Sequence, residues 1–511
     1  MSNRKKRAIS GGIASSASSL VLQLISLLVI PLYLNLTSQE IFGIWLTLGA
    51  MLGWIKIGDM GLGLALTRRS IEAIEDSDYE LLGRLTYGVI FLTLIFGAFI
   101  SGTLYFFTDT ITSFFQISNE LEKSFKNTFH ILLIVALIRP SFTVFTPIIE
   151  AKQHIAFIHI KNTSVTLMSI SLTILLLFLD FGILSFALGL LFEAAMMPLI
   201  DIVYLRTIDN KILFFSIKTS KKDIVSLLKI GAPFQFLKIA NLIATNTDNI
   251  IIASIIGVSS VTTYVFTGKL AFLFGIFFIS VLPSVLFPGV TELFVQGNIK
   301  KVRDVYFKLS DFAIRLGIFA GVLYFFINEL FIDLWVGHEN FGGMGLTAVF
   351  VIWIIFESFI RGITSIILAS GQLKSLTLVS FIEASFNIMI TLLLINSLGL
   401  IGVVLGTVIS RIITLIYVPF KINKILNINN YLYIKMLVKS IITYLMPMLI
   451  IALTINSYMS NEINSFIQII IFGVGIFITS LAFYEGLFII KQKDMTWRER
   501  IALLKNHYYS I

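Results

Sequence analysis

Long apolar segments recur along the whole chain and are separated by short polar ones. Many exceed the roughly 18 to 20 residues that a helix needs to cross a bilayer, and the two-residue alternation of a membrane β-barrel is absent. The pattern therefore predicts an all-α polytopic membrane protein with 14 transmembrane helices. The spans are expected at residues 10–36, 41–66, 86–107, 128–150, 155–179, 181–205, 228–256, 261–290, 309–335, 344–370, 375–397, 399–420, 437–457 and 464–490.

The composition agrees with a membrane protein. Hydrophobic residues make up 57% of the 511 residues and charged residues 13%, which is about half the charge content of a soluble protein. The sequence contains no cysteine, so disulfides and thiolate metal sites are excluded. A net charge of +9 would suit nucleic acid, but the basic residues lie at the ends of apolar spans, as topology signals do. We therefore expect no nucleic-acid partner.

The placement of the basic residues predicts the orientation. Of the 38 lysines and arginines, 29 lie in or beside the segments on one side of the predicted membrane. The loops on the other side hold two, Lys123 and Lys126. Positively charged loops stay in the cytoplasm, so we expect a multi-pass protein of the bacterial inner membrane with both termini cytoplasmic. The outer loops are too short for a catalytic domain, which argues against a membrane glycosyl polymerase or ligase and for a transporter.

The chain contains signs of an internal duplication. Leu104–Phe107 recurs as Leu323–Phe326, 219 residues later, and Gln153 and Gln372 have the same separation. Six spans in each half give both halves the same orientation, and parallel repeats of this kind are typical of transporters with a substrate site between the halves. The predicted domains are an N-terminal six-helix lobe, a C-terminal six-helix lobe, and two additional helices with a basic cytoplasmic tail. Their bounds are 1–215, 216–426 and 427–511.

Charged residues within spans are candidates for function, because a charge at the bilayer centre costs at least about 2.5 to 3.5 kcal/mol. Glu357 and Arg361 lie four residues apart on one helix face, which favours a structural ion pair. Lys56 and Asp59 could pair in the same way. Arg411, Glu383 and Glu485, in later helices, could link helices to each other.

Four cations are the candidate substrate-binding residues. They lie several residues inside their spans, and they are Lys56, Arg139, Lys238 and Lys269. The last three have no acid three or four positions away, so each needs a negative counterpart elsewhere. A diphosphate group would supply one, and so would a carboxylate on a facing helix, such as Asp248. The five histidines lack the paired helical spacing of a metal site, and no metal is expected.

Several short motifs resemble the Wzx-type polysaccharide (O-antigen) flippases of the MATE-like multidrug/oligosaccharidyl-lipid/polysaccharide (MOP) superfamily. The resemblance extends over essentially the whole chain. The motifs are Ile30–Leu34, Glu40–Trp45, Asp59–Gly63, Ile230–Phe234, Asp248–Ile252 and Leu400–Val403.

The resemblance implies two six-helix lobes around a central cavity lined by the first two helices of each lobe. It implies transfer of an undecaprenyl-diphosphate-linked oligosaccharide, such as an O-antigen or capsule unit, from the inner to the outer leaflet by alternating access. Asp59 and Asp248 would then be cavity acids or would couple transport to a proton or sodium gradient, with no other cofactor. The expected partners are the lipid-linked oligosaccharide and membrane lipids. A polysaccharide polymerase and its chain-length machinery are further candidate partners.

The alternative is a MATE-type ion-coupled exporter of cationic drugs. In that branch an acidic residue on the first helix often couples export to an ion gradient, and span 10–36 has no acid. An exporter of cations also needs a net acidic cavity, whereas the cations within these spans equal or exceed the acids. Both observations favour the flippase.

Overall fold

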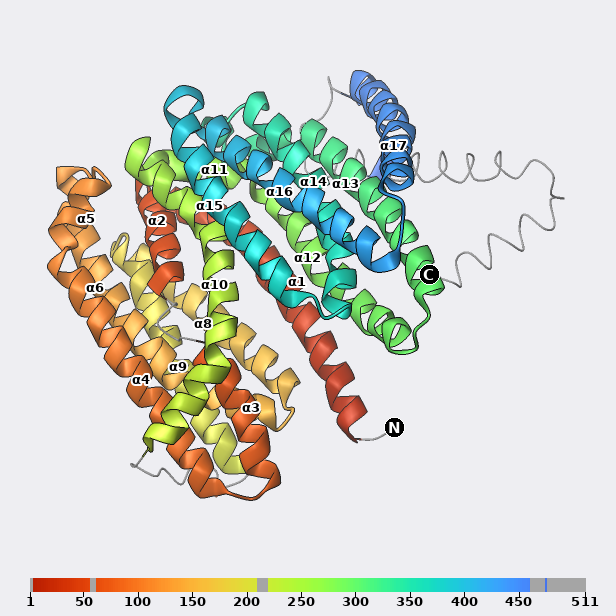
Figure 1. Cartoon of the computed structure of the whole chain (residues 1–511). Coiled ribbons are helices and arrows are strands. Elements are labelled where there is room, and N and C mark those ends of the chain that lie inside the picture. Colours follow the sequence, from red (N-terminus) through yellow and green to blue (C-terminus); the bar gives the residue numbers. More distant parts are fainter. Residues whose placement is uncertain (1–2, 56–60, 209–218, 460–473, 476–511) are drawn as a thin grey trace. The chain divides into compact units, whose positions relative to one another are not determined.

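A computed structural model of the chain describes residues 3–55, 61–208, 219–459 and 474–475. Every regular element within these ranges is a helix (Figure 1), so the predicted all-α class is confirmed. The α-helices are α1 Asn3–Leu36, α2 Gln39–Ile55, α3 Leu62–Glu75, α4 Tyr79–Phe106, α5 Thr108–Phe114, α6 Asn119–Phe142, α7 Phe145–Ala151, α8 Ile155–Phe178, α9 Leu184–Ile208, α10 Lys221–Ile255, α11 Val258–Thr267, α12 Lys269–Val295, α13 Ile299–Val336, α14 Met344–Ala369, α15 Leu373–Leu398, α16 Leu400–Leu426 and α17 Asn430–Met459. A short 3₁₀ helix, η3, covers His338–Asn340.

Ten helices in the described part are long and apolar enough to cross a membrane, and each overlaps one predicted span. Two other predicted spans are each divided between two helices: 41–66 between α2 and α3, and 261–290 between α11 and α12. The predicted span 464–490 lies almost entirely outside the described residues. The count of fourteen spans therefore stays a prediction.

Glycine and amphipathicity explain why α3 is separate from α2. Gly61 precedes α3 with φ +68°, a left-handed conformation that glycine adopts without strain. A side chain there would also collide with the backbone carbonyl of Gly231 in α10. Beyond Gly61, α3 has one apolar face and exposes Arg68 on another. This is the pattern of a helix at a protein surface rather than of a membrane span.

Contacts divide the chain into two compact units. The first comprises residues 1–266 and 373–414, and the second comprises 267–372 and 415–511. The bounds differ from those of the predicted lobes because α10, the first helix of the predicted second lobe, packs on α2 and α3 within the first unit. The lobe bounds stay a prediction, and each unit is described separately below.

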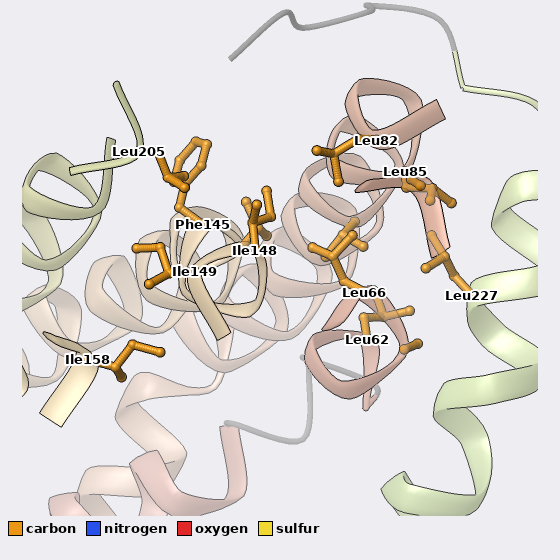
Figure 2. Packing of buried hydrophobic residues seen from close by; sticks show 14 residues of the cluster. Leu62, Leu66, Leu82, Leu85, Phe145, Ile148, Ile149, Ile158, Leu205 and Leu227 are labelled. Carbon is orange, nitrogen blue, oxygen red and sulfur yellow. The ribbon is translucent and has the colours of Figure 1, made fainter. Parts of the chain in front are cut away.

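The first unit has an apolar core of the kind found in soluble proteins. The cluster (Figure 2) joins α3, α4, α7, α8, α9 and α10. Leu62 and Leu66 of α3 and Leu82 and Leu85 of α4 are fully buried, and Leu227 of α10 packs into the same cluster. Burying one such side chain from water contributes about 1.5 to 3 kcal/mol. This core fixes the start of α10 against α3 and α4.

Polar contacts reinforce the start of α10. Ser220 and Asp223 form a capping box, in which each side chain accepts a hydrogen bond from the other residue's backbone N–H. Arg84 of α4 adds a 3.4 Å contact from its Nε to Oδ2 of Asp223. Burial alone would raise the pKa of Asp223, but the hydrogen bonds from Ser220 and the charge of Arg84 outweigh it and hold that pKa below its ordinary value.

The same turns recur in the two halves of the sequence. Positive φ angles occur at Ser77 and Gly297, at Gln153 and Gly371, and at Gly182 and Gly399, with separations of 217 to 220 residues. The side chains of Asp78 and Asn298 cap the helices that follow the first pair of turns, by accepting from the backbone N–H three residues ahead. Recurrent turns at a near-constant separation are what a duplicated chain should show, and they match the 219-residue separation of the sequence repeat.

Candidate functional site

Arg139 has an acidic partner that its sequence neighbourhood does not reveal. It lies on α6 directly before Pro140, and its Nη2 is 2.6 Å from Oε1 of Glu193 on α9. Of the two counterparts that the sequence left open, the structure shows a carboxylate on a facing helix, 54 residues away, and a role for Arg139 in substrate binding stays a prediction. The guanidinium has five N–H donors, and the side chain is 31% exposed. It therefore retains capacity to bind a second anion.

The pair formed by Glu357 and Arg361 is confirmed. In the second unit, Nε of Arg361 donates to Oε1 of Glu357 at 2.7 Å, four residues apart on α14. The Glu357 side chain is buried and the Arg361 side chain is partly exposed. The pair neutralises a buried acid within one helix, which is the structural role that the sequence predicted.

Asp248 lies at the centre of a cluster of oxygen atoms in the first unit. Its Oδ2 accepts from the hydroxyl of Tyr264 on α11 at 3.0 Å and is 3.5 Å from Oγ1 of Thr407 on α16. Nδ2 of Asn387 on α15 donates to the same threonine hydroxyl at 2.8 Å. Oδ1 of Asp248 and Oδ1 of Asn387 are buried, and no described residue forms a hydrogen bond with either oxygen. Carboxylate, hydroxyl and amide oxygens are the atoms that bind a hard cation, and a carboxylate can also take up a proton.

One helical turn away, α15 and α16 are joined by a second polar contact. Nη1 of Arg411 lies 2.6 Å from Oε1 of Glu383, and the hydroxyl of Thr414 donates to the other carboxylate oxygen. The prediction that Glu383 and Arg411 link helices is confirmed. Since Glu383 already has a cation and a hydroxyl as partners, Asp248 is the better candidate for an exchangeable ion.

The remaining predicted residues are described unequally. Lys269, in the second unit, is the first residue of α12 and is partly buried. The backbone of Lys238 belongs to α10, but its side chain is outside the described part of the structure. Lys56 and Asp59 lie outside the described residues altogether. Their roles therefore stay predictions.

The sequence did not point to the most deeply buried ion pair among the described residues. Nζ of Lys161 on α8 is 2.6 Å from Oδ1 of Asp201 on α9, and both side chains are at most 1% exposed. The hydroxyl of Thr146 on α7 completes the group, at 2.5 Å from the other oxygen of Asp201. Both residues of this ion pair lie near the predicted cytoplasmic ends of their spans. A lysine at such a position resembles a topology signal, so nothing in the sequence indicates a buried pair.

The fold has close counterparts among solved transporter structures. The chain is similar to the lipid II flippase MurJ in an inward closed conformation, with a TM-score of 0.71 and 16% identity, over 93% of this chain and all of that one. It is also similar to an inward-facing multidrug resistance MATE family transporter of the MOP superfamily, with a TM-score of 0.65 and 15% identity. That match covers 84% of this chain and 95% of the other. The chain therefore has a MurJ- and MATE-like fold, and the ten long apolar helices of its described part make it a multi-pass membrane protein.

The family follows from the sequence. Residues 9–294, more than half of the chain, match the model of the polysaccharide biosynthesis protein family, and the chain belongs to that family. A relative from Salmonella typhi, "Putative O-antigen transporter", is 24% identical over 334 residues, which cover 62% of this chain and 71% of the relative. These relatives and structural neighbours are transporters and flippases rather than enzymes.

Proposed function

We propose that this protein moves an undecaprenyl-diphosphate-linked oligosaccharide from the inner to the outer leaflet of the bacterial inner membrane by alternating access. The observation that carries the proposal is the match of residues 9–294 to the polysaccharide biosynthesis protein family in a chain with a fold similar to that of a lipid II flippase. Lys269 is the first residue of the 27-residue apolar helix α12, and a diphosphate would offer its ammonium two negative charges and several acceptor oxygens in addition to its contacts within the protein.

In this mechanism the cations bind the diphosphate while the sugar occupies the watery interior and the polyprenyl chain stays in lipid. Lys269 and Lys238 supply point charges. Arg139 can add directed hydrogen bonds through the donors that Glu193 leaves unused. Both termini would remain in the cytoplasm throughout, a placement that the distribution of lysine and arginine supports.

The test is reconstitution into vesicles with a lipid-linked oligosaccharide and a reagent that modifies sugars of the outer leaflet only. The protein should accelerate access to the reagent. Lys269→Ala should slow it by about tenfold or more, which is the cost of losing one hydrogen bond to a charged group. Lys126→Ala is the matched control, since that lysine is bound to Asp109 and Glu122 at the predicted outer surface. Equal rates for all variants and for empty vesicles would refute the proposal.

An ion gradient would supply the direction of transport, and the oxygen cluster around Asp248 is the proposed site. Asp248→Asn keeps the shape of the side chain but removes the charge that a proton or sodium ion would neutralise. We expect the variant to bind substrate but to lose its response to imposed proton or sodium gradients. An unchanged response to both gradients would exclude this site.

The cationic-drug exporter is the alternative function. The same vesicles, loaded with a cationic dye and given a proton or sodium gradient, distinguish the two. Export of the dye together with no movement of the lipid-linked sugar would favour the exporter.

A further inference from the structure

The helix that carries Lys269 begins at a break. α11 ends at Thr267 and α12 begins at Lys269, with Gly268 between them at φ −78° and ψ −6°, whereas a regular α-helix has ψ near −42°. The carbonyl of Gly268 already bonds the amide of Phe272 at 2.8 Å, so the second helix is regular from its first turn. The break places Lys269 at the start of a helix rather than in the middle of one.

Two side chains of α13 hold the carbonyl at this break. The hydroxyl of Tyr324 donates to the backbone oxygen of Thr267 at 2.7 Å, and Nδ2 of Asn328 donates to the same oxygen at 3.2 Å. A carbonyl oxygen has two lone pairs, and both are occupied here. The oxygen of Thr267 therefore has no capacity left for the amide of Ala271, which would be its partner in a continuous helix.

The contacts around Thr267 form a network within the second unit. Nδ2 of Asn328 is also 3.1 Å from the Tyr324 hydroxyl and 3.2 Å from Oγ1 of Thr347. The side chain of Thr267 accepts from the backbone N–H of Gly342 at 2.8 Å. Thr267, Tyr324, Asn328 and Thr347 are fully buried. Polar groups buried this deeply are costly without partners, and these contacts satisfy them except for Oδ1 of Asn328, which no described residue hydrogen-bonds. The network therefore favours the broken conformation.

We propose that Tyr324 and Asn328 are positioning residues for substrate binding. They keep the chain broken between Thr267 and Lys269, so that the ammonium of Lys269 meets the diphosphate at the start of α12. The inference rests on the proposed function, because it assumes that Lys269 binds the anion. It assigns the role to residues that touch Thr267 and not the substrate.

The sequence repeat provides a matched control. Tyr105 occupies the position of Tyr324 in the first copy of the Leu-Tyr-Phe-Phe motif, but it lies at the end of α4 and is 56% exposed. Tyr324 is fully buried in the middle of α13. The same hydroxyl can thus be removed from an exposed and from a buried copy of one motif.

The test uses the absence of cysteine from the chain. Lys269→Cys introduces a single thiol, and 2-aminoethyl methanethiosulfonate attaches an aminoethyl group through a disulfide, with sulfinate as the leaving group, which restores an ammonium. We expect Lys269→Cys to flip lipid-linked oligosaccharide about tenfold more slowly or worse, and the attached amine to recover most of the rate. The recovery should be lost when Tyr324→Phe and Asn328→Leu are also present and kept with Tyr105→Phe.

The outcomes separate the two proposals. If Lys269→Cys is fully active, the proposed substrate site fails and the inference falls with it. If Lys269→Cys is impaired but the amine restores it equally in every background, the positioning role is overturned and the flippase proposal stands. Should the variant with Asn328→Leu fail to fold, Tyr324→Phe alone carries the test, because it removes one hydroxyl and keeps the ring.

Discussion

The buried pair of Lys161 and Asp201 allows a direct test of the first unit's architecture. Lys161→Met leaves the carboxylate of Asp201 with the Thr146 hydroxyl as a remaining partner, in a site where the carboxylate is inaccessible to solvent. Asp201→Asn leaves the ammonium without a counter-charge. Each single change should therefore destabilise the packing of α7, α8 and α9, while the double variant removes both charges at once.

The magnitude follows from burial. Breaking a buried ion pair by removing one partner costs about 3 to 5 kcal/mol, because an uncompensated charge is left behind. Replacing both partners by uncharged groups is often close to neutral. The exposed pair of Arg68 and Glu72, at 3.9 Å and with side chains 71% and 44% exposed, is the control. A surface pair contributes about 0 to 1 kcal/mol, so Arg68→Met should have little effect.

The assay is the temperature at which the purified protein in detergent loses its monodisperse peak in size-exclusion chromatography. We expect the order wild type, then the double variant, then the two single variants, with Arg68→Met close to wild type. If the single variants at Lys161 and Asp201 had the same melting temperature as Arg68→Met, the reasoning would be refuted. The pair of Lys161 and Asp201 would then contribute no more to stability than a surface ion pair.

Two further predictions concern packing and pH. A methyl group at Gly43 of α2 would collide with the backbone carbonyl of Val258 in α11, whereas one at Gly49 meets nothing within 4 Å, so Gly43→Ala should lower the melting temperature and Gly49→Ala should not. Asp223 has a pKa below its ordinary value, so its contribution to stability is complete above the unfolded-state pKa and is lost as the pH falls through the folded-state pKa. Asp223→Asn keeps the side-chain oxygen but removes the charge, so it should lower the melting temperature at neutral pH and have little effect at a pH below both values, as compared by melting at each pH.

Hydrophobic pattern was sufficient to predict the class and most of the helices. Ten predicted spans overlap described helices because a run of about twenty apolar residues has few alternatives in a bilayer. The pair of Glu357 and Arg361 was predictable for a similar reason, since a spacing of four residues on one helix fixes which side chains meet. These features depend on local geometry.

Features that depend on packing between helices were not predictable in the same way. Glu193 lies 54 residues from Arg139 and Asp201 lies 40 from Lys161, and no spacing rule connects them. The break before Lys269 depends on Tyr324 and Asn328, which follow it by more than fifty residues. Glycine is common within the apolar segments of membrane helices. Gly268 by itself therefore does not predict that the helix is interrupted before Lys269.

The cations within the predicted spans fall into two groups by residue type. Each of the four arginines is paired with an acid: Arg139 with Glu193, Arg315 with Asp311, Arg361 with Glu357, and Arg411 with Glu383. Arginine suits this role because its planar, permanently charged group binds carboxylates directionally and is only weakly hydrated. The lysines carry compact charges on flexible stems: Lys161 is paired with Asp201, and Lys269 is the one of the three candidate substrate-binding lysines whose side chain is described. In the proposed mechanism the protein has to release its anion after each cycle, and a lysine ammonium would bind a diphosphate without the directional hydrogen bonds of the arginine pairs.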